Sequence, residues 1–259
     1  DKPPHARYEA AKFIRPLEPW VTADGGEARA FSDPAVGTMR VARDGLVLHH
    51  SGGADGHGYA VCLACGRAAE ETGEDAPSPL KAHAPLFRSR KGGETCGEGA
   101  FTVQRRLRLG ADQRTDVFEL TFAQLPGDDD GKRTGRAIGA ALREALARDL
   151  GVDAQDMGVV ARGRRDPTTG IERTTILLHD RPAGGAGYAI LAAEDAPALL
   201  KAARDILDCP SGDACETACP RCVLARDLQY DQTGLDRRRA LEFLDREVLP
   251  RLALPRELK

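Results

Sequence analysis

The second half of the chain has clear hydrophobic periodicity. Apolar and polar residues alternate over Thr115–Phe122, which predicts a half-buried strand. Apolar residues recur at helical spacing after Thr134, so a helix capped by Thr134 is expected to run to Leu150 and stop at Gly151. Similar patterns predict strands over Phe101–Leu109, Met157–Arg162 and Thr174–His179, and helices over Ala196–Leu207 and Asp236–Leu249.

The first half of the chain predicts shorter elements. Two apolar stretches, residues 39–42 and 46–49, flank Asp44-Gly45, and this arrangement is typical of a β-hairpin. The whole pattern favours an α+β fold class. We expect a mixed sheet with flanking helices, closed by a four-cysteine zinc site, over residues 100–259. A smaller β-rich part that resembles a zinc ribbon is expected over residues 1–99.

The composition narrows the functional classes. The chain has 259 residues, of which 41% are hydrophobic and 30% are charged, as in globular proteins. Apolar runs are too short for a membrane span, so no membrane partner is expected. The net charge of −3 means that any nucleic-acid binding must come from local basic patches. Seven cysteines, an odd number, argue against a full disulfide framework and favour metal ligation in the cytoplasm.

The densest cysteine cluster lies near the C-terminus. Cys209, Cys215, Cys219 and Cys222 fall within fourteen residues, with gaps of five, three and two residues between them. Thiolates at this spacing can converge on one tetrahedral ion, and Zn²⁺ is the usual occupant of a four-sulfur site. Two disulfides, or four unrelated thiols, are the structural alternatives. The cytoplasmic context favours a structural zinc site.

A second metal site is predicted around Cys62-Leu63-Ala64-Cys65-Gly66. The glycine after the second cysteine lets backbone amides turn toward the sulfurs, as in a zinc knuckle. Cys96 supplies a third thiol, and His83 is the best fourth ligand, with His49, His50 and His57 as competitors. A redox-active Cys-x-x-Cys pair is the alternative, but no helix is predicted to start there and lower the thiol pKa.

Four basic clusters could contribute to nucleic-acid binding: one at Arg88, Arg90 and Lys91, and three arginine clusters that are the main candidates. Each alone is typical of a solvated face, but together they could form a phosphate track. The arginines are Arg105, Arg106, Arg108, Arg162, Arg164, Arg165, Arg237, Arg238 and Arg239. Aromatic residues make up only 5% of the chain, which argues against base stacking as the main mode of binding.

A polar turn follows the strand that ends at His179 and Asp180. Gly184, Gly185 and Gly187 stand where a phosphate-binding loop would lie, but the spacing fits no dinucleotide fingerprint. A tight strand-to-helix turn is the simpler interpretation. His179 and Asp180, with Asp116 nearby, could serve a metal-dependent hydrolase, although a hydrogen-bond network that holds the turn explains them as well. Residues 127–134 resemble a P-loop only superficially and are interpreted as a solvated loop.

The elements from residue 100 to 250 together resemble a known family. The resemblance rests on Leu109-Gly110, Thr115-Asp116-Val117, Leu150-Gly151-Val152, Ile176–Asp180, Pro182 with Gly184–Tyr188, and the four cysteines from Cys209 to Cys222. These occur, in this order, in the C-terminal zinc-binding domain of unknown function of DEAD/DEAH-box helicases. It is the MrfA-type zinc-binding domain, which also occurs in the helicase-partner subunit of DISARM anti-phage systems.

The resemblance implies an accessory domain of a DNA helicase or helicase complex, acting in DNA repair or antiviral defence. Its partners would be helicase motor domains, in cis or in trans, and DNA, either single-stranded or as duplex backbone. The sequence contains no ATPase motif, so the chain is expected to be a non-catalytic part of an ATP-dependent helicase system. A metal-dependent nuclease or phosphodiesterase using His179 and Asp180 is one alternative, and a protein–protein scaffold without DNA binding is another.

Overall fold

The computed structural model describes residues 19–53, 55–86, 95–96, 102–166, 169–225, 227–228 and 234–253. Contacts group these residues into two compact units. Unit 1 holds residues 48–112, and unit 2 holds residues 20–47 and 113–253 in their described parts. The domain boundary expected between residues 99 and 100 stays a prediction.

Unit 2 is built on a six-stranded sheet. The strand order is β1-β3-β7-β9-β8, and β2 pairs with β3 outside this path. The strands are β1 (Trp20–Thr22), β2 (Glu27–Ala30), β3 (Gly37–Ser51), β7 (Leu109–Pro126), β8 (Met157–Arg165) and β9 (Glu172–Asp180). The last seven residues of β9 are all buried, as expected of a central strand that is covered on both faces.

The Asp44-Gly45 hairpin expected from the sequence is wrong. Both residues lie inside the continuous strand β3. A side chain at Gly45 would collide with Val117 of β7 and with the carbonyl oxygen of Thr22 in β1. Glycine is therefore needed because neighbouring strands approach closely here, which is a known use of glycine inside a strand.

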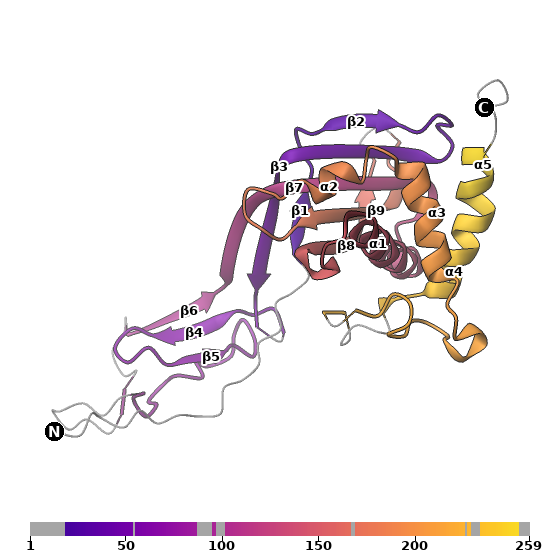
Figure 1. The fold of residues 1–259 in the computed structure, drawn as a ribbon. Coiled ribbons are helices and arrows are strands. Elements are labelled where there is room, and N and C mark those ends of the chain that lie inside the picture. The colour runs from indigo at the N-terminus through magenta and orange to yellow at the C-terminus, as the bar shows by residue number, and fades with distance from the viewer. Residues whose placement is uncertain are drawn as a thin grey trace. The chain divides into compact units, whose positions relative to one another are not determined.

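Helices cover one face of this sheet. They are α1 (Asp129–Leu150), α2 (Tyr188–Leu191), α3 (Ala196–Leu207), α4 (Arg237–Phe243) and α5 (Leu249–Ala253), with a π-helical turn at Leu244–Val248 that joins α4 to α5. Figure 1 shows α1, α3 and the α4–α5 segment beside one another, and contacts join all three. The bounds of α3 match the sequence prediction.

The start of α1 differs from the prediction. Asp128, not Thr134, caps the helix by accepting a hydrogen bond from the backbone N–H of Gly131 at 2.8 Å. Asp129 and Asp130 occupy the first turn, where their charges favour the positive end of the helix dipole. The stretch interpreted as a solvated loop therefore forms the cap and first turn of the helix. Gly151 ends α1 in the left-handed conformation, as expected.

The sheet of unit 2 has apolar side chains on both faces. The larger cluster lies between the sheet and the helices, and includes Phe118, Phe122 and Leu178. A smaller cluster on the other face joins Val21 of β1 to Val160 of β8 and Leu177 of β9. Because β1 at one end of the strand order also contacts β9, the sheet is curled.

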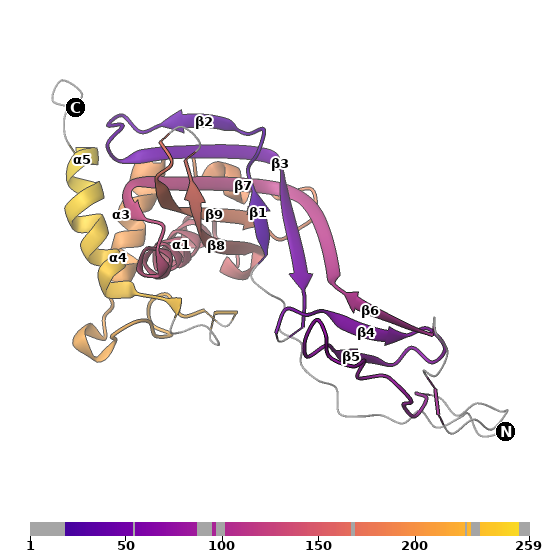
Figure 2. The same ribbon diagram turned by 180° about the vertical axis from the view of Figure 1, so that it is seen from behind.

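Unit 1 contains a small three-stranded sheet, visible in Figure 2. Its order is β5-β4-β6, formed by β4 (Tyr59–Cys62), β5 (Ala68–Glu70) and β6 (Val103–Leu107). Among the described residues of unit 1, the buried apolar cluster consists of Ala60, Cys62 and Leu80, with Cys65, Ala69, Cys96 and Val103 packed against it. A core of this size stabilises little by hydrophobic burial, and domains of this kind usually need a metal or disulfides.

The α+β class expected from the sequence is confirmed. No helix among the described residues has the length and apolar character needed to cross a membrane.

Candidate metal centres

The four-cysteine centre of unit 2 begins where α3 ends. Cys209 follows the last helical turn, and a 3-10 turn at Gly212–Ala214 leads to Cys215. The sulfur–sulfur distances are 3.5 Å for Cys209–Cys219, 3.7 Å for Cys215–Cys222 and 3.8 Å for Cys219–Cys222. Four sulfurs bonded at about 2.3 Å to one tetrahedral ion lie about 3.8 Å apart. The donor set and its spacing therefore fit Zn²⁺.

The Cys219–Cys222 knuckle is organised by its own backbone. The N–H of Cys222 donates to the carbonyl of Cys219 at 3.0 Å, and the N–H of Leu224 donates to the same carbonyl at 3.2 Å. The N–H of Cys219 also points at the sulfur of Cys222, at 3.3 Å. Backbone amides directed at a sulfur favour its thiolate form, which is the form that binds metal.

The four-cysteine centre is part of the main apolar core. Cys209, Cys215 and Cys222 belong to the same buried cluster as the helices and the sheet. A site with four protein sulfurs and no open position has the character of a structural zinc site, because a catalytic zinc keeps one position for water or substrate. This centre can therefore brace the fold but offers no reactive metal.

Arg237 supports this centre from inside the protein. It is the first residue of α4, its side chain is buried, and it donates to the carbonyls of Leu207 at 3.0 Å, Gly212 at 3.0 Å and Cys215 at 2.6 Å. These carbonyls belong to the backbone that carries Cys209 and Cys215. A zinc ion with four thiolates carries a net charge of −2, so a buried guanidinium beside it offsets part of that charge.

The thiols of this centre differ in acidity. Burial opposes ionisation of Cys219, but the backbone of Arg221 and the neighbouring thiols outweigh it and lower its pKa to about 6. Burial, followed by hydrogen bonds from Cys219 and Cys222, raises the pKa of Cys215 to about 12. Without metal, the thiolate is thus favoured at Cys219 and the thiol at Cys215, so metal binding must release protons.

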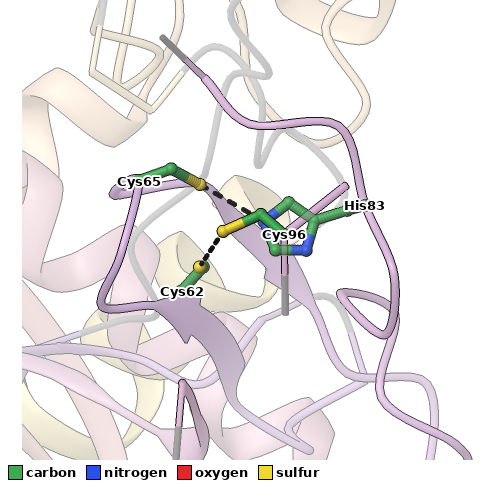
Figure 3. Close-up of side chains that lie close together, drawn as sticks. All are labelled: Cys62, Cys65, His83 and Cys96. Carbon is green, nitrogen blue, oxygen red and sulfur yellow. Dashed lines mark hydrogen bonds between the residues drawn. The ribbon is translucent and has the colours of Figure 1, made fainter. Parts of the chain in front are cut away.

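The second centre lies in unit 1 and joins three cysteines to one histidine (Figure 3). Cys62 ends β4, and the chain turns back at once, because Gly66 donates to the carbonyl of Cys62 at 2.7 Å and adopts a φ of 76°. The sulfurs of Cys62 and Cys96 are 3.4 Å apart, and the sulfur of Cys65 is 3.2 Å from Nε2 of His83. Three sulfurs and one imidazole nitrogen form a donor set suited to Zn²⁺.

His83 is held in the orientation that a ligand needs. Its Nδ1 lies 2.6 Å from the carbonyl oxygen of Leu80, so Nδ1 carries the proton and donates it, which leaves Nε2 unprotonated and directed at the thiols. His83 and Cys96 also exchange two backbone hydrogen bonds, of 2.9 Å and 2.7 Å. The structure thus brings His83 into the site, and His49, His50 and His57 are not part of the group.

The thiols of the second centre are also unequal. Burial raises the pKa of Cys65, but hydrogen bonds from the backbone of Leu86 and Arg67 outweigh it, and the pKa falls to about 6. The hydrogen bond with Cys62, together with burial, raises the pKa of Cys96 to about 11. The prediction of two zinc sites, one with four cysteines and one with three cysteines and a histidine, is confirmed by these two groupings and the family match given below.

The predicted functional turn is a closed hydrogen-bond network. Asp180 is fully buried, and its carboxylate accepts from the backbone N–H groups of Ala186, Tyr188 and Ala189 at 2.7–3.1 Å. Asp116 accepts from the N–H of Gly187 at 3.0 Å. Two carboxylates of the protein thus occupy the amides that could otherwise have bound a phosphate.

The same network accounts for the other residues of the turn. Gly184 donates to the carbonyl of Arg114 at 2.8 Å, and a side chain at Gly185 would collide with the Asp116 carboxylate. The ring of His179 is buried and lies against Gly158 of β8. Burial, followed by the nearby charge of Asp180, raises the pKa of Asp116 against the opposing hydrogen bond from Gly187. These contacts assign the turn a structural role.

The arginines predicted to bind nucleic acid are divided between the two units, and most of them contact acidic side chains or backbone carbonyls. In unit 1, Arg105 makes a two-pronged ion pair with buried Glu71, Arg106 donates to the carbonyl of Glu74, and Arg108 lies 3.5 Å from the carbonyl of Gly56. In unit 2, Arg237 is buried, Arg238 contacts Asp213, and Arg239 contacts Asp130. Arg162, Arg164 and Arg165 all lie on β8.

Sequence reasoning missed a partly buried ion pair that fastens the chain after the four-cysteine centre. Arg143 of α1 is almost fully buried and forms two hydrogen bonds to the Asp227 carboxylate, at 2.7 Å and 3.1 Å. Arg181 also contacts Asp227, at 2.8 Å. Burial alone would raise the pKa of Asp227. The positive charges of Arg143 and Arg181 outweigh burial, so the pKa lies below its ordinary value. No local sequence pattern predicts an ion pair whose partners lie 84 residues apart.

These features define a two-zinc module whose metal centres are structural. Residues 138–223 match the family model of the MrfA Zn-binding domain. This segment contains most of α1, the strands β8 and β9, α3 and all four cysteines of the first centre. The resemblance to the MrfA-type zinc-binding domain that the sequence predicts is confirmed by this match over residues 138–223.

Individual relatives are similar over much of this chain. Druantia protein DruE of Escherichia coli (strain UMEA 4076-1) is 31% identical over 220 residues, which cover 76% of this chain and 11% of that protein. Crystal structures of the DUF1998 helicase MrfA bound to DNA, and to DNA and AMPPNP, are 15% identical, with TM-scores of 0.44 and 0.38. They cover 88% and 89% of this chain, and 26% and 23% of the MrfA chains. The chain thus spans a small part of the length of each relative it matches.

Proposed function

We propose that the chain is an accessory zinc-binding domain of a DNA helicase or helicase complex. In this role it packs against the motor domains and takes part in DNA engagement, in DNA repair or anti-phage defence. The observation that carries the proposal is the four-cysteine centre within the segment that matches the MrfA Zn-binding domain. The similarity to DruE over most of the chain supports the same assignment.

The structure of the centres supports a bracing role for zinc. Neither centre has an open position, and both are built from side chains held by backbone contacts. Zinc in such sites contributes folding energy rather than chemistry. The nuclease alternative gains no support, because His179 and Asp180 are buried and Asp180 is occupied by three backbone amides.

DNA engagement can be tested with the zinc-loaded chain and fluorescein-labelled oligonucleotides. We expect anisotropy to report binding that weakens as salt rises, because phosphate contacts release counterions. Absence of binding to single-stranded and duplex DNA at low salt would favour a scaffold that only contacts protein. A second assay, pull-down of a helicase motor fragment with the immobilised chain, tests motor packing separately.

A further inference from the structure

Four arginines lie on the sheet face that the helices leave open. Val160 and Leu177, which pair across β8 and β9, belong to the small apolar cluster on this face. Side chains alternate along strands, so Arg162 and Arg164 of β8 and Arg173 of β9 share the same face. Arg40 of β3 joins them, because it lies 3.8 Å from Glu119, which also contacts Arg164. We call Arg40, Arg162, Arg164 and Arg173 the arginine face.

The arginine face has an excess of positive charge. Glu119 is buried beneath it and accepts two hydrogen bonds from Arg164, at 2.7 Å and 2.8 Å. Asp166 lies 3.9 Å from Arg173. The side chains of Arg40, Arg164 and Arg173 keep 32%, 38% and 27% of their surface exposed. The printed ion pairs of this face join three guanidiniums, of Arg40, Arg164 and Arg173, to two carboxylates, so these paired groups carry a net charge of +1, which suits a polyanion.

An exposed tryptophan borders this face. Trp20, the first residue of β1, is 53% exposed, and the guanidinium of Arg162 lies 4.0 Å from the centre of its ring. The other aromatic side chains among the described residues are buried or half-buried. A cation stacked on the indole fixes the orientation of the ring, and an exposed indole surface is a place where a nucleobase can stack.

We propose that Trp20 and the arginine face bind a short single-stranded DNA segment. One unpaired base stacks on Trp20, and its flanking phosphates contact Arg164 and Arg173. The inference rests on the proposed DNA engagement and specifies which kind of DNA is bound and where. A duplex would offer phosphates but no free base face.

The experiment exploits the fact that Trp20 is the only tryptophan in the chain. Its fluorescence is recorded while the zinc-loaded protein is titrated with unlabelled oligothymidine, and in parallel with a duplex of equal length. We expect quenching by the single strand, saturating at the affinity measured by anisotropy. Equal or tighter duplex binding without any change in fluorescence would overturn the proposal and leave DNA engagement intact.

Variants separate stacking from charge. Trp20→Ala should weaken binding of labelled oligothymidine by about tenfold or more, because stacking on one aromatic contributes about 1–3 kcal/mol. Trp20→Phe should recover most of the affinity. Arg173→Gln should weaken binding and reduce the salt slope by about one unit. Arg246→Gln, which removes an exposed arginine of α4–α5 paired with Glu242, is the matched charge control and should bind like wild type.

The outcomes distinguish failure of the proposed Trp20 site from failure of the proposed DNA engagement. Tight single-strand binding that Trp20→Ala leaves unchanged would refute the site while DNA engagement stands. A Trp20 fluorescence change produced only by a helicase motor fragment would make this face a protein interface and would also refute it. If neither DNA form binds at low salt, the proposed DNA engagement itself fails.

Discussion

The two zinc centres use similar ligands but stand in different structural settings. The four-cysteine centre lies within a large core, in which Cys209, Cys215 and Cys222 pack with the helices and the sheet. The centre of unit 1 lies beside a cluster of three buried residues, one of which, Cys62, is itself a ligand. The same ion would therefore fasten a loop to a large core in unit 2, whereas in the described part of unit 1 it would lie at a small apolar cluster.

The difference extends to what surrounds each metal. In unit 2 the chain around the cysteines is also held by buried Arg237 and by the Arg143–Asp227 pair. In unit 1 the corresponding supports are the His83–Leu80 hydrogen bond and the ion pair between Arg105 and Glu71. We infer that unit 1 depends on zinc for its fold and that unit 2 depends on zinc only locally.

The largest expected effect is loss of the unit 1 fold in Cys62→Ser. Structural zinc contributes about 10–16 kcal/mol of apparent binding energy in small metal-dependent domains, far more than three buried residues can replace. Limited proteolysis should release fragments within residues 48–112 while the sheet and α1 of unit 2 stay resistant. Cys219→Ser serves as the comparison and should expose cleavage sites around residues 208–228 instead. Identical fragment patterns from both variants would break the distinction between the units.

The next effect concerns the support that unit 2 has besides its metal. Asp227→Ala leaves Arg143 buried without its carboxylate, which should cost about 3–5 kcal/mol in the free energy of unfolding. Urea denaturation with zinc present measures this cost. The control is Arg148→Ala, on the same helix, which removes an exposed pair with Glu144 and should change stability by about 0.5 kcal/mol or less. A cost as small as that of the control would show that the pair does not fasten this segment.

A smaller effect is expected at the metal itself when Arg237 is changed to Met. Loss of the three carbonyl contacts and of the compensating charge should weaken zinc binding at the four-cysteine centre by about 10–100-fold. Competition with a chromophoric chelator measures the affinity, and the unit 1 centre serves as the internal reference. Arg238→Met, whose side chain is exposed and contacts Asp213, should leave both affinities unchanged. Equal weakening of both centres by Arg237→Met would contradict a local role.

The smallest effect concerns the turn at Gly184–Gly187 in unit 2, whose backbone amides are bound by the carboxylates of Asp116 and Asp180. The pKa of Asp116 is raised, so the folded state holds its proton more tightly than the unfolded state does. The contribution of Asp116 to the free energy of unfolding therefore rises as the pH falls from above its folded-state pKa toward its unfolded-state pKa of about 3.9. Asp116→Asn keeps an oxygen for the Gly187 N–H and removes the repulsion from Asp180. We expect it to be neutral or slightly stabilising at pH 7, with its advantage shrinking toward pH 5, as denaturation curves would show. An advantage that grows toward pH 5 would reverse the sign of this argument.

Local features of the fold could be predicted from the sequence. The two ligand groups follow from short cysteine spacings and one histidine, and the bounds of α3 and the stop at Gly151 follow from helical periodicity and glycine chemistry. In each case the determining residues are close in sequence, or belong to a metal site whose chemistry restricts the choice of partner.

Features that depend on distant contacts could not be predicted. Asp44-Gly45 is typical of a turn, but strand β3 continues because Gly45 allows Val117 and β1 to approach. The arginines at the start of α4 look like a solvated basic patch, yet Arg237 is drawn inward by carbonyls of residues 207, 212 and 215. The stacking of Arg162 on Trp20 could not be predicted either, because the two residues lie on β8 and β1, at opposite ends of the strand order.

The most direct test of unequal zinc dependence is hydrogen–deuterium exchange of the full chain before and after chelation. With zinc removed, we predict that peptides from β4 and β6 exchange completely within the shortest labelling time. Peptides from β9 and the middle of α1 should keep their protection, while those around residues 208–228 lose theirs. If β4 and β6 stayed protected without metal, or if β9 and α1 lost protection together with them, the two centres would not differ as the structure indicates.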